Sequence, residues 1–275
     1  MAVGPIGTIS TIEAAVRGAA SSTGIDFGFL MRTAQRESGL QAGAHAGTSS
    51  AAGLFQFVEQ TWLGTLKHHG SAHGYARYAD LITQTPDGRF TVPQGEDARR
   101  VVMDLRYDAQ AAASMAGELA SDHAAYLRGR VGREPTGGEL YAAHFLGPQG
   151  SARLIEAANS NPNQVAAGMF PEAAASNHNV FYKAGRPVTV AELYANLNQT
   201  GGGGAGATVR AAAVDPGEGA FTAYAGAART ERQREQAMLV NFILTDGQAD
   251  RSPTSSMFSS EMLSVLSQAN NPSIP

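Results

Sequence analysis

Alanine and glycine dominate this chain, and the residue types that favour strands are scarce. Of its 275 residues 43% are hydrophobic, yet only 7% are aromatic. Alanine is the strongest helix former, whereas strands are built from runs of β-branched and aromatic residues, which are few here. We therefore predict a mainly α fold.

Apolar residues recur at helical spacing along the first 200 residues. Asp26 is a suitable N-cap for a helix that starts at residue 27, and Gly39 offers a place for that helix to end. The prolines and glycines of 85–97 predict a loop excursion or a short hairpin around Asp87-Gly88. The other segments that we predict to be helical are 8–20, 59–67, 98–128 and 137–146, followed by apolar segments at 151–158 and 189–197.

The composition changes sharply at Gly201, where the run GGGGAGA begins. Such a run is typical of flexible linkers. We therefore predict a helical domain over 1–200, a Gly/Ala-rich linker over 201–226 and a short helical tail over 227–275. The tail has too few apolar residues for a core of its own, so we expect it to dock onto a partner protein. The alternatives are that it folds back on its own domain or is disordered.

The composition also disfavours several classes of site. Because there is no cysteine, neither a disulfide nor a thiolate metal site is possible. A formal net charge of -4 and the lack of a basic run argue against nucleic-acid binding. No stretch of 18 apolar residues exists, so we expect no membrane span. The first 20 residues do not read as a secretory signal, so export requires a signal that has been removed or another route.

One carboxylate stands on the apolar face of a predicted helix. Glu37 follows Leu30 by seven residues and Ala34 by three, so it continues their core-facing stripe. Desolvation disfavours the charged form of a carboxyl group, and a carboxylic acid that keeps its proton can donate it to a leaving oxygen. The alternative is a solvated glutamate, or one paired with Arg32 or Arg36.

Two motifs give this chain a resemblance to the lytic transglycosylase and goose-type lysozyme group. Glu37-Ser38, within AQRESGL, matches the Glu-Ser motif that this family places at a helix end. Gly53-Leu54-Phe55-Gln56 matches its Gly-Leu-Met-Gln motif, after a small polar loop that includes Ser50. The resemblance implies a lysozyme-like helical domain with Glu37 as the catalytic acid. It also implies that Ser38, Ser50, Phe55 and Gln56 line the surface that binds the glycan.

The aromatic residues near the second motif allow a plainer interpretation. In an extended segment, Phe55 and Phe57 would point away from Gln56, so only one side could face sugar. Core packing is the other interpretation of Phe55 and Phe57, and the one that we prefer for Trp62.

The third family motif, Ala-Tyr-Asn-Ala-Gly, is matched only in part, by the segment 141–148 (YAAHFLGP). Alignment on Gly-Pro places His144 where the family has tyrosine and Phe145 where it has asparagine. Tyr141, one helical turn earlier, is the alternative source of a hydroxyl that orients the glutamate. His144 is then a packing residue.

The three histidines His68, His69 and His73 do not form a recognisable metal motif. His69 and His73 have the i, i+4 spacing, but Gly70 lies between them and no glutamate follows the first histidine. The glycine run at 201 lacks the strand and helix that flank a phosphate-binding loop. We therefore expect neither a metal nor an organic cofactor.

The resemblance implies a peptidoglycan lytic transglycosylase of the periplasm or cell envelope. Such an enzyme cleaves the bond between N-acetylmuramic acid and N-acetylglucosamine and forms a 1,6-anhydro product. Most glycosidases use two carboxylates, but no second acidic residue has a setting like that of Glu37, which suits the transglycosylase route. An envelope-spanning assembly is the partner that we expect for the tail. The alternatives are a lysozyme-type hydrolase or endolysin, and a non-catalytic envelope assembly factor.

Overall fold

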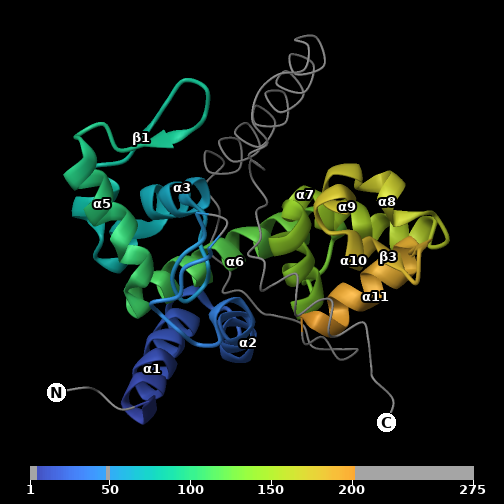
Figure 1. Ribbon diagram of the computed structural model, residues 1–275, viewed down its shortest axis with the longest axis horizontal. Helices are drawn as coiled ribbons and strands as arrows, with labels where there is room; N and C mark the ends of the chain where they lie inside the picture. Colours follow the sequence, from blue (N-terminus) through green and yellow to red (C-terminus); the bar gives the residue numbers. More distant parts are fainter. Residues whose placement is uncertain (1–4, 48–49, 202–275) are drawn as a thin grey trace. The chain divides into compact units, whose positions relative to one another are not determined.

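The computed structural model describes residues 5–47 and 50–201, and the side chains from residue 10 onward (Figure 1). This part of the chain is mainly helical, as the sequence predicted. It divides into two compact units, residues 5–58 with 104–201 and residues 59–103. The sequence had suggested one domain over 1–200. The predicted linker 201–226 and tail 227–275 lie outside the described residues, apart from Gly201.

The first unit contains eight α-helices, one 3-10 helix and one hairpin within the described residues. Their bounds are α1 Pro5–Thr23, α2 Phe27–Ser38, η2 Leu105–Tyr107, α6 Ala109–Val131, α7 Gly137–Ser160, α8 Ala166–Met169, α9 Pro171–Ser176, α10 His178–Phe181, β3 Tyr182–Lys183, β4 Arg186–Pro187 and α11 Val190–Thr200.

Several helices of the first unit begin or end at capping residues. Asp26 accepts a hydrogen bond from the backbone N–H of Phe29 at 2.7 Å, as predicted, and Gly39 ends α2 at φ 60°. Thr136 and Thr189 head α7 and α11, each in a capping box with the glutamate three residues later. Local chemistry therefore fixes both ends of α2, which carries Glu37, and the starts of α7 and α11.

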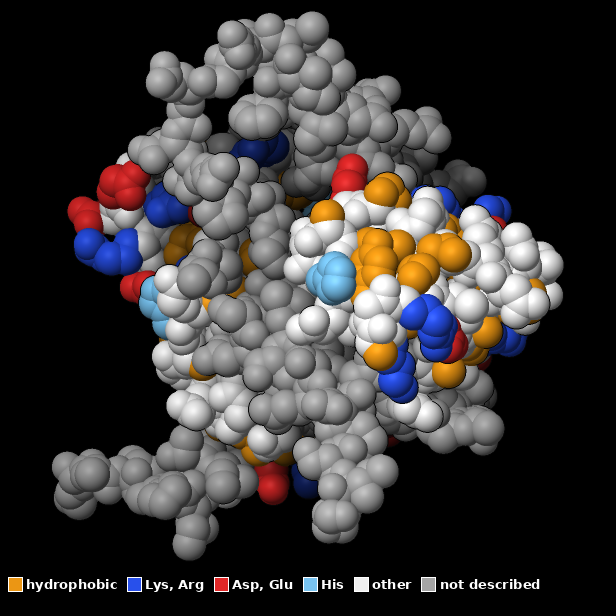
Figure 2. Space-filling view, turned by 45° about the vertical axis from the view of Figure 1, so that its right-hand side comes forward, with side chains coloured by type: hydrophobic (Ala, Val, Ile, Leu, Met, Phe, Trp, Pro, Cys, Tyr) orange, Lys and Arg blue, Asp and Glu red, His pale blue; other side chains and the backbone are white. Residues whose placement is uncertain are grey.

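Two groups of helices build the first unit. α1 packs along α6, and α6 in turn packs against α7. From α7 onward a second apolar cluster joins α7 to α11, with Tyr141, Phe145, Phe181, Leu193 and Leu197 buried in it. Figure 2 shows hydrophobic side chains grouped on the surface of this α7–α11 part. α7 thus belongs to both groups and is the element from which the third predicted motif comes.

The second unit is a small helical unit with a hairpin. Its bounds are α3 Glu59–His69, η1 Gly70–His73, α4 Ala76–Ala79, β1 Thr83–Gln84, β2 Phe90–Thr91 and α5 Glu96–Asp104. The strands pair antiparallel, with Gln84 opposite Phe90, which confirms the hairpin predicted around Asp87-Gly88. Trp62 is fully buried and donates its indole N–H to the carbonyl oxygen of Val102 at 2.9 Å. The interpretation of Trp62 as a core residue is confirmed.

One sequence prediction needs correction. The segment 98–128 is not one helix, because α5 and α6 are separated by η2 and by Asp108, which caps α6. Its apolar spacing persists across this local break, which the backbone geometry reveals. In α7 the backbone is non-helical at Gly147, at φ 73°, ψ 160°, so the predicted helix 137–146 ends at this kink and a second helical stretch follows to Ser160, which agrees with the separate segments predicted at 137–146 and 151–158. No helix in the described parts of the chain is long and apolar enough to cross a membrane.

Candidate active site

Glu37 lies at the C-terminal end of α2 and is buried, with only 3% of its surface exposed. The buried face of α2 consists of Phe29, Leu30, Thr33, Ala34 and Glu37. The sequence predicted that Glu37 continues the apolar stripe, and this is confirmed. A carboxyl group is among the most costly side chains to bury, so its position calls for either a partner or a function.

Ser38 ties the end of α2 to the loop that carries the second motif. Its hydroxyl lies 2.8 Å from the carbonyl oxygen of Leu54 and accepts a hydrogen bond from the backbone N–H of Gln41. The hydroxyl therefore links the two motifs to each other. Its predicted contact with glycan stays a prediction.

The second motif adopts a tight turn and not an extended segment. Ala52 pairs with both His45 and Phe57 in isolated bridges, and Gln56 has a left-handed backbone at φ 49°. Phe55, Gln56 and Phe57 are all buried. The turn 53–56 is closed by the bridge between Ala52 and Phe57, so the alternation expected of an extended segment does not apply.

Gln56 holds this turn together from the inside. Its side-chain amide donates to the carbonyl oxygens of Gly53 at 2.9 Å and Ala44 at 3.3 Å. Its side-chain oxygen is buried and has no hydrogen-bond partner within the described residues. The side-chain N–H groups of Gln56 thus stabilise the loop, and its side-chain oxygen can still accept a hydrogen bond from a further group.

Arg106 anchors the loop from outside the motif. Its guanidinium donates to the carbonyl oxygens of Ser50 at 2.7 Å and Phe57 at 3.0 Å. Ser50 itself is exposed, whereas Phe55 is 4% exposed and offers little surface to a ligand. Sequence reasoning missed Arg106, because nothing near residue 106 indicates a contact with a loop 50 residues earlier.

α7 brings the third motif to α2. Nε2 of His144 lies 3.4 Å from Oε1 of Glu37, which is within ion-pair range but is not aligned as a hydrogen bond. The rings of Tyr141 and His144 are roughly parallel, with centroids 6.4 Å apart. The structure therefore brings His144 to Glu37 and places the Tyr141 ring alongside that of His144.

Arg36 and Tyr141 complete the surroundings of Glu37. The Arg36 guanidinium lies 4.4 Å from the centre of the Tyr141 ring and donates to the carbonyl oxygen of Thr200. Burial raises the pKa of the Tyr141 hydroxyl, an effect that Arg36 opposes and Glu37 strengthens. Arg36 thus pairs with Tyr141 and α11, and no ion pair between Arg36 and Glu37 is seen.

Two buried polar atoms of this cluster have no hydrogen-bond partner within the described residues. They are Oε1 of Glu37 and the hydroxyl oxygen of Tyr141. Buried polar groups are normally hydrogen-bonded, so unpaired ones mark places that a water or ligand completes. Strain is found nearby as well. Leu40 and Gln56 have φ values of 62° and 49°, and such strain in residues other than glycine collects at functional sites.

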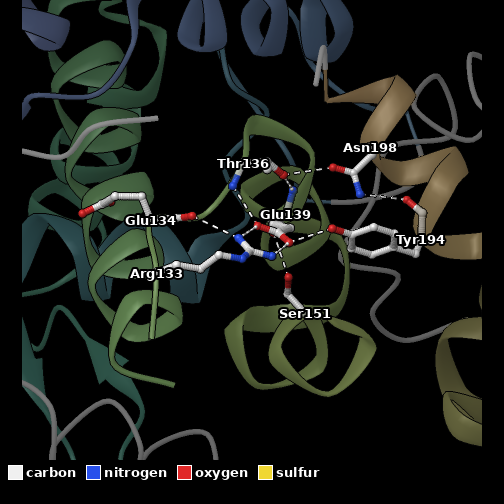
Figure 3. Close-up of polar contacts among 7 residues, drawn as sticks. All are labelled: Arg133, Glu134, Thr136, Glu139, Ser151, Tyr194 and Asn198. Carbon is white, nitrogen blue, oxygen red and sulfur yellow. Dashed lines mark hydrogen bonds and ion pairs between the residues drawn. The ribbon is translucent and has the colours of Figure 1, made fainter. Parts of the chain in front are cut away.

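The other buried carboxylate in the described residues, Glu139, is fully paired (Figure 3). Arg133 donates two hydrogen bonds to it, at 2.8 Å and 2.5 Å, and the Thr136 N–H and the Tyr194 hydroxyl donate at 2.8 Å and 2.7 Å. Burial by itself raises the pKa of Glu139, but these hydrogen bonds outweigh it and hold the pKa below its usual value. Glu139 is a structural anion.

His123 in α6 is a further buried group that sequence reasoning missed. Burial lowers its pKa to about 4, and the charge of His144 contributes in the same direction. His123 is therefore neutral at pH 7.

His68, His69 and His73 belong to the second unit, where the ring of His68 packs edge-on against Phe90. The described residues include no group of three potential metal ligands.

No known protein family has a sequence model that matches this chain. A buried carboxyl with an oxygen that accepts no hydrogen bond from the described residues, a partly exposed imidazole beside it and a buried hydroxyl form a constellation suited to proton transfer.

Proposed function

We propose that this protein is a peptidoglycan lytic transglycosylase with a lysozyme-like helical domain, in which Glu37 is the catalytic acid. The observation that carries the proposal is the buried carboxyl of Glu37, one oxygen of which no described residue hydrogen-bonds. Leaving such a group unpaired costs stability, and proteins tolerate that cost mainly at functional sites. The two motifs on either side of the Ser38–Leu54 hydrogen bond add the family resemblance.

In the proposed reaction Glu37 donates its proton to the oxygen that links N-acetylmuramic acid to N-acetylglucosamine. The bond from that oxygen to C1 of the muramic acid breaks, and its electron pair stays on the departing sugar. The Glu37 carboxylate then takes the proton of the muramoyl C6 hydroxyl, whose oxygen bonds to C1. The product is a 1,6-anhydro sugar, and Glu37 regains its proton.

A single working carboxyl favours this route over the two-carboxylate mechanisms of most glycosidases. Within the described residues the only other buried carboxylate is Glu139, and all of its hydrogen-bonding capacity is directed to Arg133, Thr136 and Tyr194. It is thus unsuited to serve as a second acid or nucleophile. The proposal implies a location in the periplasm or cell envelope.

Mass spectrometry of muropeptides released from purified sacculi tests the proposal. We expect 1,6-anhydro ends from the wild type, whereas reducing ends would identify a hydrolase and no release a non-catalytic assembly factor. Glu37→Gln should lower the release by about a hundredfold to ten-thousandfold, the usual effect of removing a general acid. It should also melt near the wild-type temperature, because the amide has the size of the carboxyl group and Oε1 of Glu37 accepts no hydrogen bond from a described residue.

Glu192→Gln is the matched control, since Glu192 is a half-exposed carboxylate on α11 that binds Arg186 and the head of its own helix. It should digest sacculi like the wild type. A folded Glu37→Gln protein that still clears cell walls at the wild-type rate would overturn the assignment.

A further inference from the structure

Unlike Glu37 and Tyr141, His144 is partly exposed to solvent. The Glu37 side chain is 2% exposed, whereas the His144 side chain is 31% exposed. A glycosidic oxygen must come within about 3 Å of an acid that protonates it. In this conformation the Glu37 carboxyl group is too deeply buried for such an approach. The His144 imidazole is the partly exposed group in contact with it.

Two further residues of this cluster, Arg36 and Tyr141, are held in place. Arg36 is fixed by its hydrogen bond to the Thr200 carbonyl and by the Tyr141 ring beneath it. Tyr141 has no exposed surface and belongs to the core of the α7–α11 part. Moving either of them would disturb the packing of whole helices. The contacts of His144 with Glu37 and with the Tyr141 ring involve no hydrogen bond.

The helix α7 has fewer backbone hydrogen bonds close to His144. A helical hydrogen bond to the carbonyl oxygen of His144 would come from residue 148, which is proline and has no N–H. Gly147 between them is non-helical, with φ 73° and ψ 160°. His144 thus occupies the last turn before the kink in α7, where fewer helical hydrogen bonds resist a local movement.

We propose that the His144 side chain is a movable cover over the Glu37 carboxyl group, which turns aside to let the glycosidic oxygen of the glycan take its place. That the incoming group is a glycosidic oxygen rests on the proposed function. That His144 covers Glu37 rests on the burial of Glu37, on its contact with His144 and on the kink at Gly147. In this role His144 is a positioning residue that controls access, and Glu37 performs the proton transfer.

Carboxyl labelling tests the cover without requiring activity. The folded protein is treated with a water-soluble carbodiimide and an amine, and the label on each glutamate is quantified by mass spectrometry of peptides. We expect little label on Glu37 in the wild type and several-fold more in His144→Ala. His144→Phe keeps a ring of similar size and should stay close to the wild type. Glu139 and Glu192 in the same digest serve as buried and exposed references.

His144→Ser is a second truncation in case His144→Ala does not fold, which circular dichroism would reveal. Equal labelling of Glu37 in the wild type and in a folded truncation would overturn the cover. If sacculi are digested, the truncations should also lower KM more than they change kcat, because the glycan no longer has to displace the ring. If neither the wild type nor any variant cleaves glycan, the proposed function is wrong. The labelling result still tests whether His144 covers Glu37.

Discussion

The carbonyl oxygen of Arg106 occupies the place where a β-carbon on residue 53 would have to be. Gly53 also has a left-handed backbone, with φ 81°. The first residue of the Gly-Leu-Phe-Gln motif must therefore be glycine for two independent reasons, conformation and close approach. The contact fixes the loop that Ser38 joins to the helix of Glu37.

Gly53→Ala should accordingly destabilise the first unit and disturb the loop. The methyl group clashes with backbone that cannot move aside, and overpacking of this kind costs about 1–3 kcal/mol or more. Chemical denaturation followed by circular dichroism measures the loss. Gly43→Ala is the matched control, because a β-carbon at residue 43 meets no atom within 4 Å. Equal stability of the two variants would contradict the prediction.

Glu139→Gln should destabilise the protein far more than Glu192→Gln. Both glutamates close a capping box and accept two hydrogen bonds from an arginine six residues earlier, but Glu139 is fully buried and the side chain of Glu192 is 42% exposed. Breaking a buried ion pair costs roughly 3–5 kcal/mol. We expect about 2 kcal/mol or more for Glu139→Gln, because the Arg133 side chain is itself half exposed and solvent screens part of the loss.

The comparison is made by urea denaturation of the two variants side by side. In Glu192→Gln water replaces the lost contacts, so its midpoint should stay near that of the wild type. Similar midpoints for Glu139→Gln and Glu192→Gln would show that burial does not distinguish the two sites.

His123 should make the free energy of unfolding depend on pH. Its pKa is about 4 in the folded protein against about 6.5 in an unfolded chain, so between these values only the unfolded chain binds the proton. The free energy of unfolding therefore falls as the pH falls from about 6.5 to 4, by up to about 1.4 kcal/mol per pH unit. His123→Leu should flatten this part of the pH dependence. Substitution of the exposed His45 should leave it in place.

Tyr141→Phe separates a functional hydroxyl from a structural ring. The hydroxyl is buried and lacks a hydrogen-bond partner among the described residues, so its removal breaks no such bond and should not lower the melting temperature. Because the hydroxyl shares the environment of Glu37, we expect slower digestion of sacculi. Unchanged digestion by Tyr141→Phe would remove the hydroxyl from the site. It would leave His144 as the working residue of the third motif.

The sequence by itself determined the local features of this protein. Alanine content and helical spacing indicated a mainly helical chain, and the caps at Asp26 and Gly39 marked the ends of α2. The same spacing placed Glu37 on the buried face. These predictions succeeded because each depends on residues within a few helical turns of one another. Interactions over such short sequence distances can be predicted from the sequence.

Only the tertiary structure decided which of these groups are paired and which are covered. The sequence left His144 and Tyr141 as alternatives, whereas the structure places the His144 ring against Glu37 and the Tyr141 ring against Arg36. Arg-x-x-Thr-x-x-Glu occurs at both 133–139 and 186–192, and one glutamate is buried while the other is half exposed. Burial is set by segments distant in the sequence, such as the Tyr194 hydroxyl on Glu139, and so identical local motifs acquire different energetics.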